Sequence, residues 1–232
     1  MSGSLTDNLF WRKNSMKKRE IAELACTELE KLYPDAECSL NYEKPYELMF
    51  AARLSAQCTD ARVNIVTQTL FKKYPTLESF AEADLEELEQ CVKPCGFYHT
   101  KAKSLKGMAQ KMIAEFGGEI PKTMEELLTL PGIGRKTANL VMGDIWGKPA
   151  IVTDTHFIRI TGRLGLTKNK EPAKVEKDLL PLIPPEKSSA LCHRIVQFGR
   201  DVCSARSPKC EACSLNYFCT YYKQNNKGKK NG

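Results

Sequence analysis

Four cysteines near the end of the sequence have the spacing of a metal site. They fall within seventeen residues, whereas the chain's other six cysteines are dispersed; the four are Cys203, Cys210, Cys213 and Cys219. Four thiolates this close together imply a closed site, and because no coordination position is left for a substrate, the metal would be structural. Short Cys-x2-Cys spacings serve both zinc and iron–sulfur clusters. The spacing alone favours zinc, with an iron–sulfur cluster as the alternative.

The run LPGIGRK at residues 130–136 could bind a phosphate and supply an amine nucleophile. Gly132 and Gly134 allow a tight turn whose backbone N–H groups approach a DNA phosphate, next to Arg135 at the positive end of the following helix. An ordinary helical hairpin with a Pro-Gly turn is the alternative. Lys136, two residues beyond the turn, favours the functional interpretation.

An aspartate, Asp154, follows a short β-branched stretch and precedes another helical pattern. Capping that helix is the commoner role for such a residue. Capping and catalysis are compatible, because a capped helix N-terminus holds a carboxylate in a fixed position. His156 fits a hydrogen-bonded structural histidine better than a base, and we assign it no role.

The elements that must position these residues are helices almost throughout, so the sequence predicts an all-α fold. Breaks at Pro34, Pro75, residues 117–118, residues 131–132 and Pro149 separate the helical patterns. The hairpin lies between a helix with a Thr123/Glu126 capping box and an apolar helix through Val141. Further helices are expected to start at Asp60 and Pro172. Residues 48–54 are apolar nearly all round, which predicts a central buried helix.

Length and composition exclude a membrane protein more clearly than they identify a partner. The 232 residues, 42% of them hydrophobic, suffice for one large or two small domains. No apolar run approaches the ~18 residues of a membrane span, and no signal-like segment is present, so we expect a cytoplasmic protein.

The net charge of +7 lies mostly in the tails. Residues 1–20 hold five basic and two acidic residues, and the last ten residues hold four lysines and no acid. The rest of the chain is balanced, so net charge says little about DNA binding. We expect residues 223–232 to form a disordered basic tail.

Three further stretches complete a pattern that resembles the endonuclease III family: LSAQCTD at 54–60, GFYHTKA at 96–102 and FGR at 198–200. The likeness covers about residues 20 to 220. It implies a bifunctional DNA glycosylase that removes oxidised pyrimidines and cleaves the abasic site. It also implies a 4Fe–4S cluster on the four cysteines, which reverses the preference for zinc.

The resemblance also implies the architecture. A six-helix, barrel-like domain with the helix-hairpin-helix would span residues 38–148, and a discontinuous iron–sulfur domain would comprise residues 1–37 and 149–222. Double-stranded DNA with damaged bases or abasic sites would lie in a groove between them. The protein would act as a monomer at the nucleoid.

The family's reaction assigns roles to individual residues. Lys136 matches the lysine that attacks the sugar C1′, expels the base and forms the Schiff base that leads to β-elimination. Asp154 matches the aspartate that stabilises positive charge on the sugar or accepts a proton. Gln57 and Phe97 match positions that fill the gap left by an everted nucleotide.

The sequence departs from the family pattern around these last positions. Phe97 stands where an aliphatic residue is common, and Cys95, His99 and Cys58 are also unusual. These changes put the preferred lesion in doubt. Without the resemblance, Phe97 could also be a core aromatic.

Two alternative functions remain compatible with parts of this pattern. An adenine-specific mismatch glycosylase shares the hairpin and the cysteines, but that family lacks the lysine and carries a further C-terminal domain, whereas this sequence ends soon after Cys219. A DNA-binding or scaffolding module would keep the hairpin and the metal without turnover.

Overall fold

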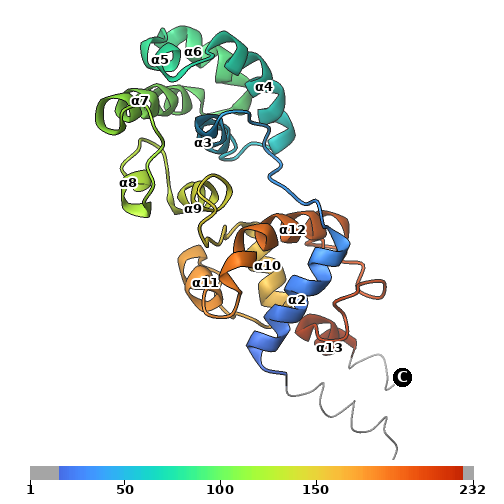
Figure 1. Ribbon diagram of the computed structural model, residues 1–232. Helices are drawn as coiled ribbons and strands as arrows, with labels where there is room; N and C mark the ends of the chain where they lie inside the picture. The colour runs from blue at the N-terminus through green and yellow to red at the C-terminus, as the bar shows by residue number, and fades with distance from the viewer. Residues whose placement is uncertain (1–15, 227–232) are drawn as a thin grey trace, which may run out of the picture. The chain divides into compact units, whose positions relative to one another are not determined.

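The computed structural model describes residues 16–226, and its contacts divide them into two compact units. One unit comprises residues 38–150, and the other comprises residues 16–37 together with 151–226. The regular elements of both units are helices, and the described residues contain no strand, which confirms the all-α prediction (Figure 1). None of the described helices is both long and apolar enough to span a bilayer.

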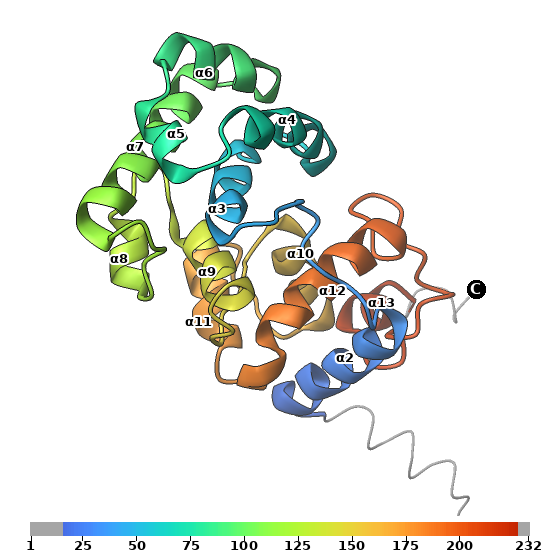
Figure 2. The same cartoon turned by 45° about the horizontal axis from the view of Figure 1, so that its top comes forward.

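The continuous unit is built around one helix, α3. Its helices are α3 (Pro45–Leu54), α4 (Asp60–Lys73), α5 (Leu77–Glu82), α6 (Leu85–Val92), α7 (Tyr98–Phe116), α8 (Met124–Leu128) and α9 (Arg135–Asp144), with a 3-10 turn η1 (Lys93–Cys95). Helix α3 contacts α4, α7 and α9 (Figure 2). Leu48 to Ala51 and Leu54 have no exposed surface. The central buried helix predicted from residues 48–54 is therefore confirmed.

Local signals set the ends of several helices. The Glu47 carboxylate accepts hydrogen bonds from the backbone of residues 43 and 44 and so fixes the start of α3. The Thr123/Glu126 capping box at the start of α8 is present as predicted. Helix α4 begins at Asp60 as expected, but its cap is the preceding residue, Thr59, whose hydroxyl accepts from Arg62 N.

The continuous unit has seven α-helices among its described residues, one more than the six expected. The segment between residues 77 and 92 is broken because Ala83 is extended and the Asp84 carboxylate accepts from Glu87 N, 2.9 Å away. A side-chain cap at this point starts a new helix, α6, rather than extending α5.

The discontinuous unit packs α2 (Lys18–Leu32) against residues 151–226. Its other helices are α10 (Thr155–Leu164), α11 (Pro172–Leu179), α12 (Ser188–Asp201) and α13 (Thr220–Asn226), with a 3-10 turn η2 (Pro185–Lys187). Helix α12 contacts both α2 and α10, and the three share one apolar core. Pro172 occupies the first turn of α11, as predicted.

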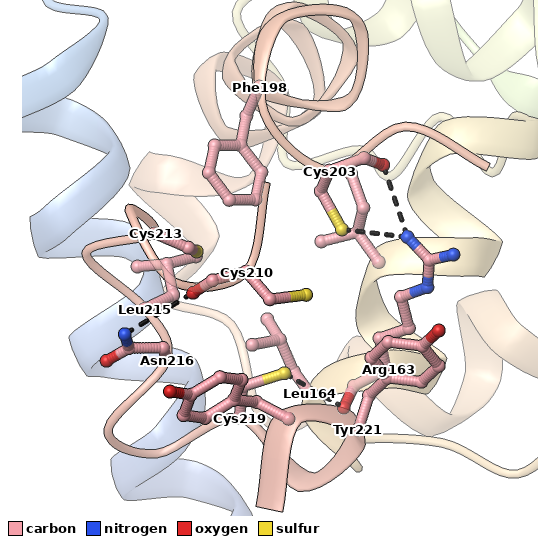
Figure 3. A pocket seen from close by; sticks show the side chains of 12 residues that line it. Arg163, Leu164, Phe198, Cys203, Cys210, Cys213, Leu215, Asn216, Cys219 and Tyr221 are labelled. Carbon is pink, nitrogen blue, oxygen red and sulfur yellow. Dashed lines mark hydrogen bonds between the residues drawn. The ribbon is translucent and has the colours of Figure 1, made fainter. Parts of the chain in front are cut away.

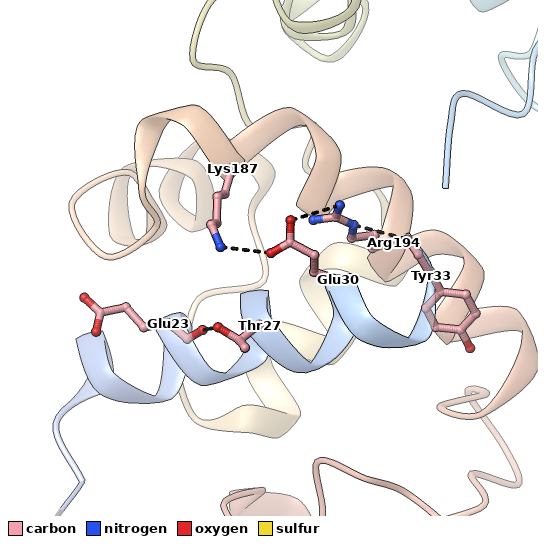
Figure 4. A network of polar contacts seen from close by, with 6 residues as sticks. All are labelled: Glu23, Thr27, Glu30, Tyr33, Lys187 and Arg194. Carbon is pink, nitrogen blue, oxygen red and sulfur yellow. Dashed lines mark hydrogen bonds and ion pairs between the residues drawn. The ribbon is translucent and has the colours of Figure 1, made fainter. Parts of the chain in front are cut away.

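A polar network ties α2 to α12 across more than 150 residues of sequence (Figure 4). The Glu30 carboxylate accepts from Lys187 Nζ at 2.9 Å and pairs with Arg194 Nη2 at 3.5 Å. Arg194, which is 8% exposed, also donates to Tyr33 O at 3.2 Å. Because the guanidinium is largely buried, its hydrogen bonds define where α2 lies on this core.

The expected start of a disordered tail at Lys223 is wrong. Helix α13 runs through Lys223 to Asn226, and Thr220 at its start donates to Leu164 O at 3.1 Å. The Arg163 guanidinium also lies 4.7 Å from the Tyr221 ring centre. These contacts with α10 fix the beginning of α13. Residues 227–232 of the expected tail lie outside the described residues.

Candidate functional site

The hairpin turn between α8 and α9 requires a glycine at position 132. Gly132 has φ +80°, and a Cβ there would lie 2.6 Å from both Arg53 Nε and Ser104 Oγ. Leu130 and Ile133 are buried on either side of it, so the turn is held down by apolar side chains. The glycine lets the chain reverse direction directly over α3 and α7.

Gly134 needs a different explanation. Its φ of −105° suits any residue, and a Cβ there would meet nothing within 4 Å. Gly134 is the N-cap of α9, and no side chain caps that helix. Uncapped amides at a helix start attract anions, and a missing side chain lets a ligand approach the backbone closely.

Lys136 and Arg135 begin α9, and both side chains are exposed. Ala138 and Val141 on the opposite side of α9 are fully buried, so the helix is firmly anchored. Within the described residues no carboxylate lies within ion-pair distance of Lys136. The amine is thus presented to a ligand from a rigid element.

Asp154 caps α10, as the sequence predicted. Its Oδ1 accepts from Phe157 N at 2.7 Å, and its own N–H donates to Val152 O at 3.1 Å. Phe157 is fully buried, which fixes the start of α10 in the core. Among the described residues no hydrogen bond engages Oδ2, so the capped carboxylate retains an oxygen that can face a substrate.

His156 contacts a neighbouring arginine, which is compatible with the structural interpretation of this histidine. Its Nδ1 lies 3.1 Å from Arg159 Nη2, and a Cβ on Gly199 would lie 2.4 Å from the same ring atom. Lys136 belongs to the continuous unit and Asp154 to the discontinuous one.

Gln57 and Phe97 share a backbone feature that the sequence did not reveal. They are the only non-glycine residues with positive φ in the described range, at +55° and +49°. Left-handed backbone costs an ordinary residue about 1–2 kcal/mol, and such strain concentrates at functional sites. Phe97 is also 67% exposed, which excludes the alternative of a core aromatic.

The four cysteines line one cavity in the discontinuous unit (Figure 3). Its lining also includes the apolar side chains of Leu164, Phe198 and Leu215. Burial raises the pKa of the Cys213 thiol to about 11 and raises that of Cys219 as well. Metal binding must therefore displace protons from these sulfurs.

The donor set fits an iron–sulfur cluster. Within the described residues, no three His, Cys, Asp or Glu side chains lie close enough together to hold a single ion. Four thiolates around one zinc would each lie ~2.3 Å from it. A cluster, which carries its own iron and sulfide, spans a wider cage of thiolates.

Arg163 also lines the cavity of the four cysteines, and the sequence analysis did not identify it. Its Nη1 donates to Cys203 Sγ at 3.1 Å and to Ser204 O at 2.7 Å, and its Nη2 donates to Ala205 O at 2.9 Å. The guanidinium therefore joins α10 to the loop that begins the cysteine segment. No motif around Arg163 indicated this, because the contact joins residues about 40 positions apart.

Comparisons with known proteins match both the hairpin and the cysteines. A family model described as the HhH-GPD superfamily of base excision DNA repair proteins matches residues 50–185, and one for the iron–sulfur binding domain of endonuclease III matches residues 203–219. The second match runs from the first to the last of the four cysteines. It confirms the iron–sulfur prediction and overturns the preference for zinc that spacing alone gave.

Whole-chain comparisons agree with these matches. The chain is 47% identical over 209 residues to endonuclease III of Synechocystis sp., covering 90% of this chain and 95% of the relative. A solved non-covalent endonuclease III–DNA complex has a TM-score of 0.85 at 42% identity, covering 92% of this chain and 100% of that one. A trapped covalent endonuclease III–DNA intermediate has a TM-score of 0.84 at 42% identity, covering 91% and 99%.

Proposed function

Because the chain belongs to the endonuclease III family of base-excision DNA repair enzymes, we propose that it removes oxidised pyrimidines from duplex DNA through Lys136 and then cuts the strand. The family membership makes it a DNA glycosylase and abasic-site lyase with a 4Fe–4S cluster. The observation that carries the assignment of Lys136 is its position, exposed in the first turn of α9 directly after the glycine hairpin. We further propose that the protein acts as a monomer, in the cytoplasm at the nucleoid.

In the proposed reaction, amides at the hairpin and the start of α9, next to Arg135, bind a backbone phosphate of the damaged strand. The nucleotide turns out of the stack, and Gln57 and Phe97 occupy the space that it leaves. These contacts carry no base information. Lesion choice therefore falls to the residues around the everted base and its estranged partner.

The neutral Lys136 amine then forms a bond to C1′ as the bond from C1′ to the base breaks, and the base leaves with that electron pair. Opening of the C1′–O4′ bond gives the Schiff base, for which the attacking amine still has a proton to lose. Removal of a proton from C2′ then expels the 3′ phosphate. Asp154 stabilises the positive charge that develops on the sugar or accepts a proton.

Cys203, Cys210, Cys213 and Cys219 would hold the cluster, and Arg163 would donate to one of its thiolates. When bound, the cluster supplies cross-links that order the segment from residue 203 to 219. No step at the sugar requires an electron from it.

A panel of duplexes, each with one defined lesion, tests the proposed function. We expect release of the free base and a shortened strand from duplexes with oxidised pyrimidines, and little product from an intact duplex or one with an adenine mismatch. Tight binding to every duplex without turnover would instead support a DNA-binding module.

The two hairpin glycines should respond differently to substitution. Gly132→Ala is expected to destabilise the protein by on the order of 2 kcal/mol, because its Cβ meets Arg53 and Ser104 at positive φ. Gly134→Ala, whose Cβ meets nothing, should lower the melting temperature less than Gly132→Ala and weaken binding to abasic-site DNA about tenfold, as its methyl blocks a phosphate. Thermal melts and DNA titrations check both, and full affinity in Gly134→Ala would remove the phosphate contact from the hairpin.

Asp154→Asn should separate capping from catalysis. Asparagine caps helices as well as aspartate, so we expect unchanged stability and a single-turnover rate lower by about 10²-fold. Asp84→Asn, at the cap of α6, is the matched control and should leave the rate unaltered. Equal rates for Asp154→Asn and the native protein would return Asp154 to a capping role alone.

A further inference from the structure

Lys101 is buried to an extent unusual for a lysine. It lies in α7 with 1% of its surface exposed, in the continuous unit. Among the described residues no carboxylate lies within ion-pair distance of it, and burial lowers the pKa of its amine. A buried ammonium without a counter-ion is costly, so its hydrogen bonds must offset that cost.

Those hydrogen bonds join the two strained segments. Lys101 Nζ donates to Leu54 O at 2.8 Å and to Cys95 O at 2.8 Å. Leu54 is the last residue of α3 and Cys95 the last of η1, so both carbonyls lie at ends where helical partners run out. The Lys101 backbone N–H also donates to Phe97 O at 3.0 Å.

Gln57 follows the first of these carbonyls by three residues, and Phe97 follows the second by two. Both have left-handed backbone, which the surrounding structure must impose because neither residue favours it. Lys101 is a single side chain that contacts both segments. We propose that Lys101 is a positioning residue that holds the segments of Gln57 and Phe97 in register so that both side chains enter the DNA together.

The same side of α7 supports the hairpin. Ser104, three residues after Lys101, accepts from Arg53 Nε at 3.2 Å, and both side chains lie directly under Gly132. One face of α7 thus connects the Gln57 and Phe97 segments with the turn before Lys136. The proposal rests on the proposed role of Gln57 and Phe97 in filling the gap in duplex DNA.

The test replaces Lys101 by methionine, which keeps the apolar stem and removes every donor. Lys106→Met is the matched control, because Lys106 lies on the same helix and donates to a carbonyl of the α5–α6 connection, Ala83 O, at 2.7 Å. We expect Lys101→Met to slow excision from lesion-containing duplex about 10- to 100-fold. Abasic-site cleavage in single-stranded DNA, which needs no gap filled, should stay within about twofold.

Amide hydrogen exchange gives a readout that is independent of DNA. In Lys101→Met, residues 55–59 and 95–98 should exchange faster than in the native protein, while α5 and the cluster segment keep their protection. Lys106→Met should leave both segments protected. If Lys101→Met does not fold, Lys101→Gln, which retains a shorter donor, is measured instead and should give a smaller change in the same two segments.

The variants Gln57→Ala and Phe97→Ala test the gap-filling role of these residues separately from the positioning role of Lys101. If neither slows duplex excision, the gap-filling role is wrong, whatever Lys101 does. If both slow it while Lys101→Met matches Lys106→Met in exchange and rate, the role of Lys101 alone is overturned. Equal losses on duplex and single-stranded DNA in Lys101→Met would also overturn it, since they would indicate general damage to the fold.

Discussion

Replacing Lys136 by glutamine is expected to abolish the covalent adduct that borohydride traps between the protein and abasic-site DNA. Glutamine is shorter than lysine and can still donate a hydrogen bond, but its amide nitrogen is no nucleophile and cannot form an imine. Strand cleavage should fall by on the order of 10⁴-fold, because the amine takes part in every covalent step. Gel separation of the reduced adduct measures the first effect and single-turnover cleavage the second.

Because Lys136 is exposed, the effect of its replacement on the reaction can be separated from an effect on the fold. The side chain has no described carboxylate partner, so its replacement should alter neither the fold nor the visible colour of the cluster. Lys103→Gln, at another exposed lysine of the same unit, is the control and should give a full yield of adduct. DNA binding by Lys136→Gln should persist. An adduct of undiminished yield in Lys136→Gln would place the nucleophile at another amine.

The features that the sequence predicted well are those set by nearby residues. The capping box of α8, the Asp154 cap and the buried helix at residues 48–54 depend on side chains within one or two helical turns, so their patterns are legible in the sequence. The assignment of Lys136, which stays a prediction, also came from local sequence, namely its position just after two glycines.

The features that the sequence did not predict depend on contacts between distant segments. The residue types at Gln57 and Phe97 do not indicate a left-handed backbone, since neither glutamine nor phenylalanine favours it. Lys101 lies in the stretch GFYHTKA, but nothing in the sequence suggested a role for it, because lysines are almost never fully buried. The helix at residues 220–226 follows from packing on α10, which the polar composition of that segment hid.

The identity of the metal could not be predicted from the cysteine spacing alone. Ligand spacing fixes which sulfurs can meet, but zinc and iron–sulfur sites share short spacings. The resemblance to the endonuclease III family favoured the cluster over zinc, and the match of residues 203–219 to that family's iron–sulfur binding domain confirms it.

Cys213→Ala is expected to cost the protein its cluster and much of the order of the segment from residue 203 to 219. Because metal binding energy contributes directly to folding in such segments, losing one of four ligands should lower the melting temperature by roughly 10 °C or more. The preparation should lose its brown colour and most of its iron. Limited proteolysis should then cut within the cysteine segment, which we expect to resist in the native protein.

Loss of the cluster should also slow excision, because α10 connects the cysteine segment with Asp154. Asp154 caps the start of that helix, and Arg163 near its end is bonded to Cys203 Sγ and to the loop after it. When the loop loosens, α10 loses contacts along its C-terminal turn, so excision should slow although no ligand touches the sugar. Cys26→Ala, at a fully buried cysteine of α2 in the same unit, is the control; it removes a core thiol, yet should keep iron and colour. A colourless, iron-free Cys213→Ala protein with native melting temperature and native excision rate would show that the segment folds without the cluster, and that the link through Arg163 carries no catalytic effect.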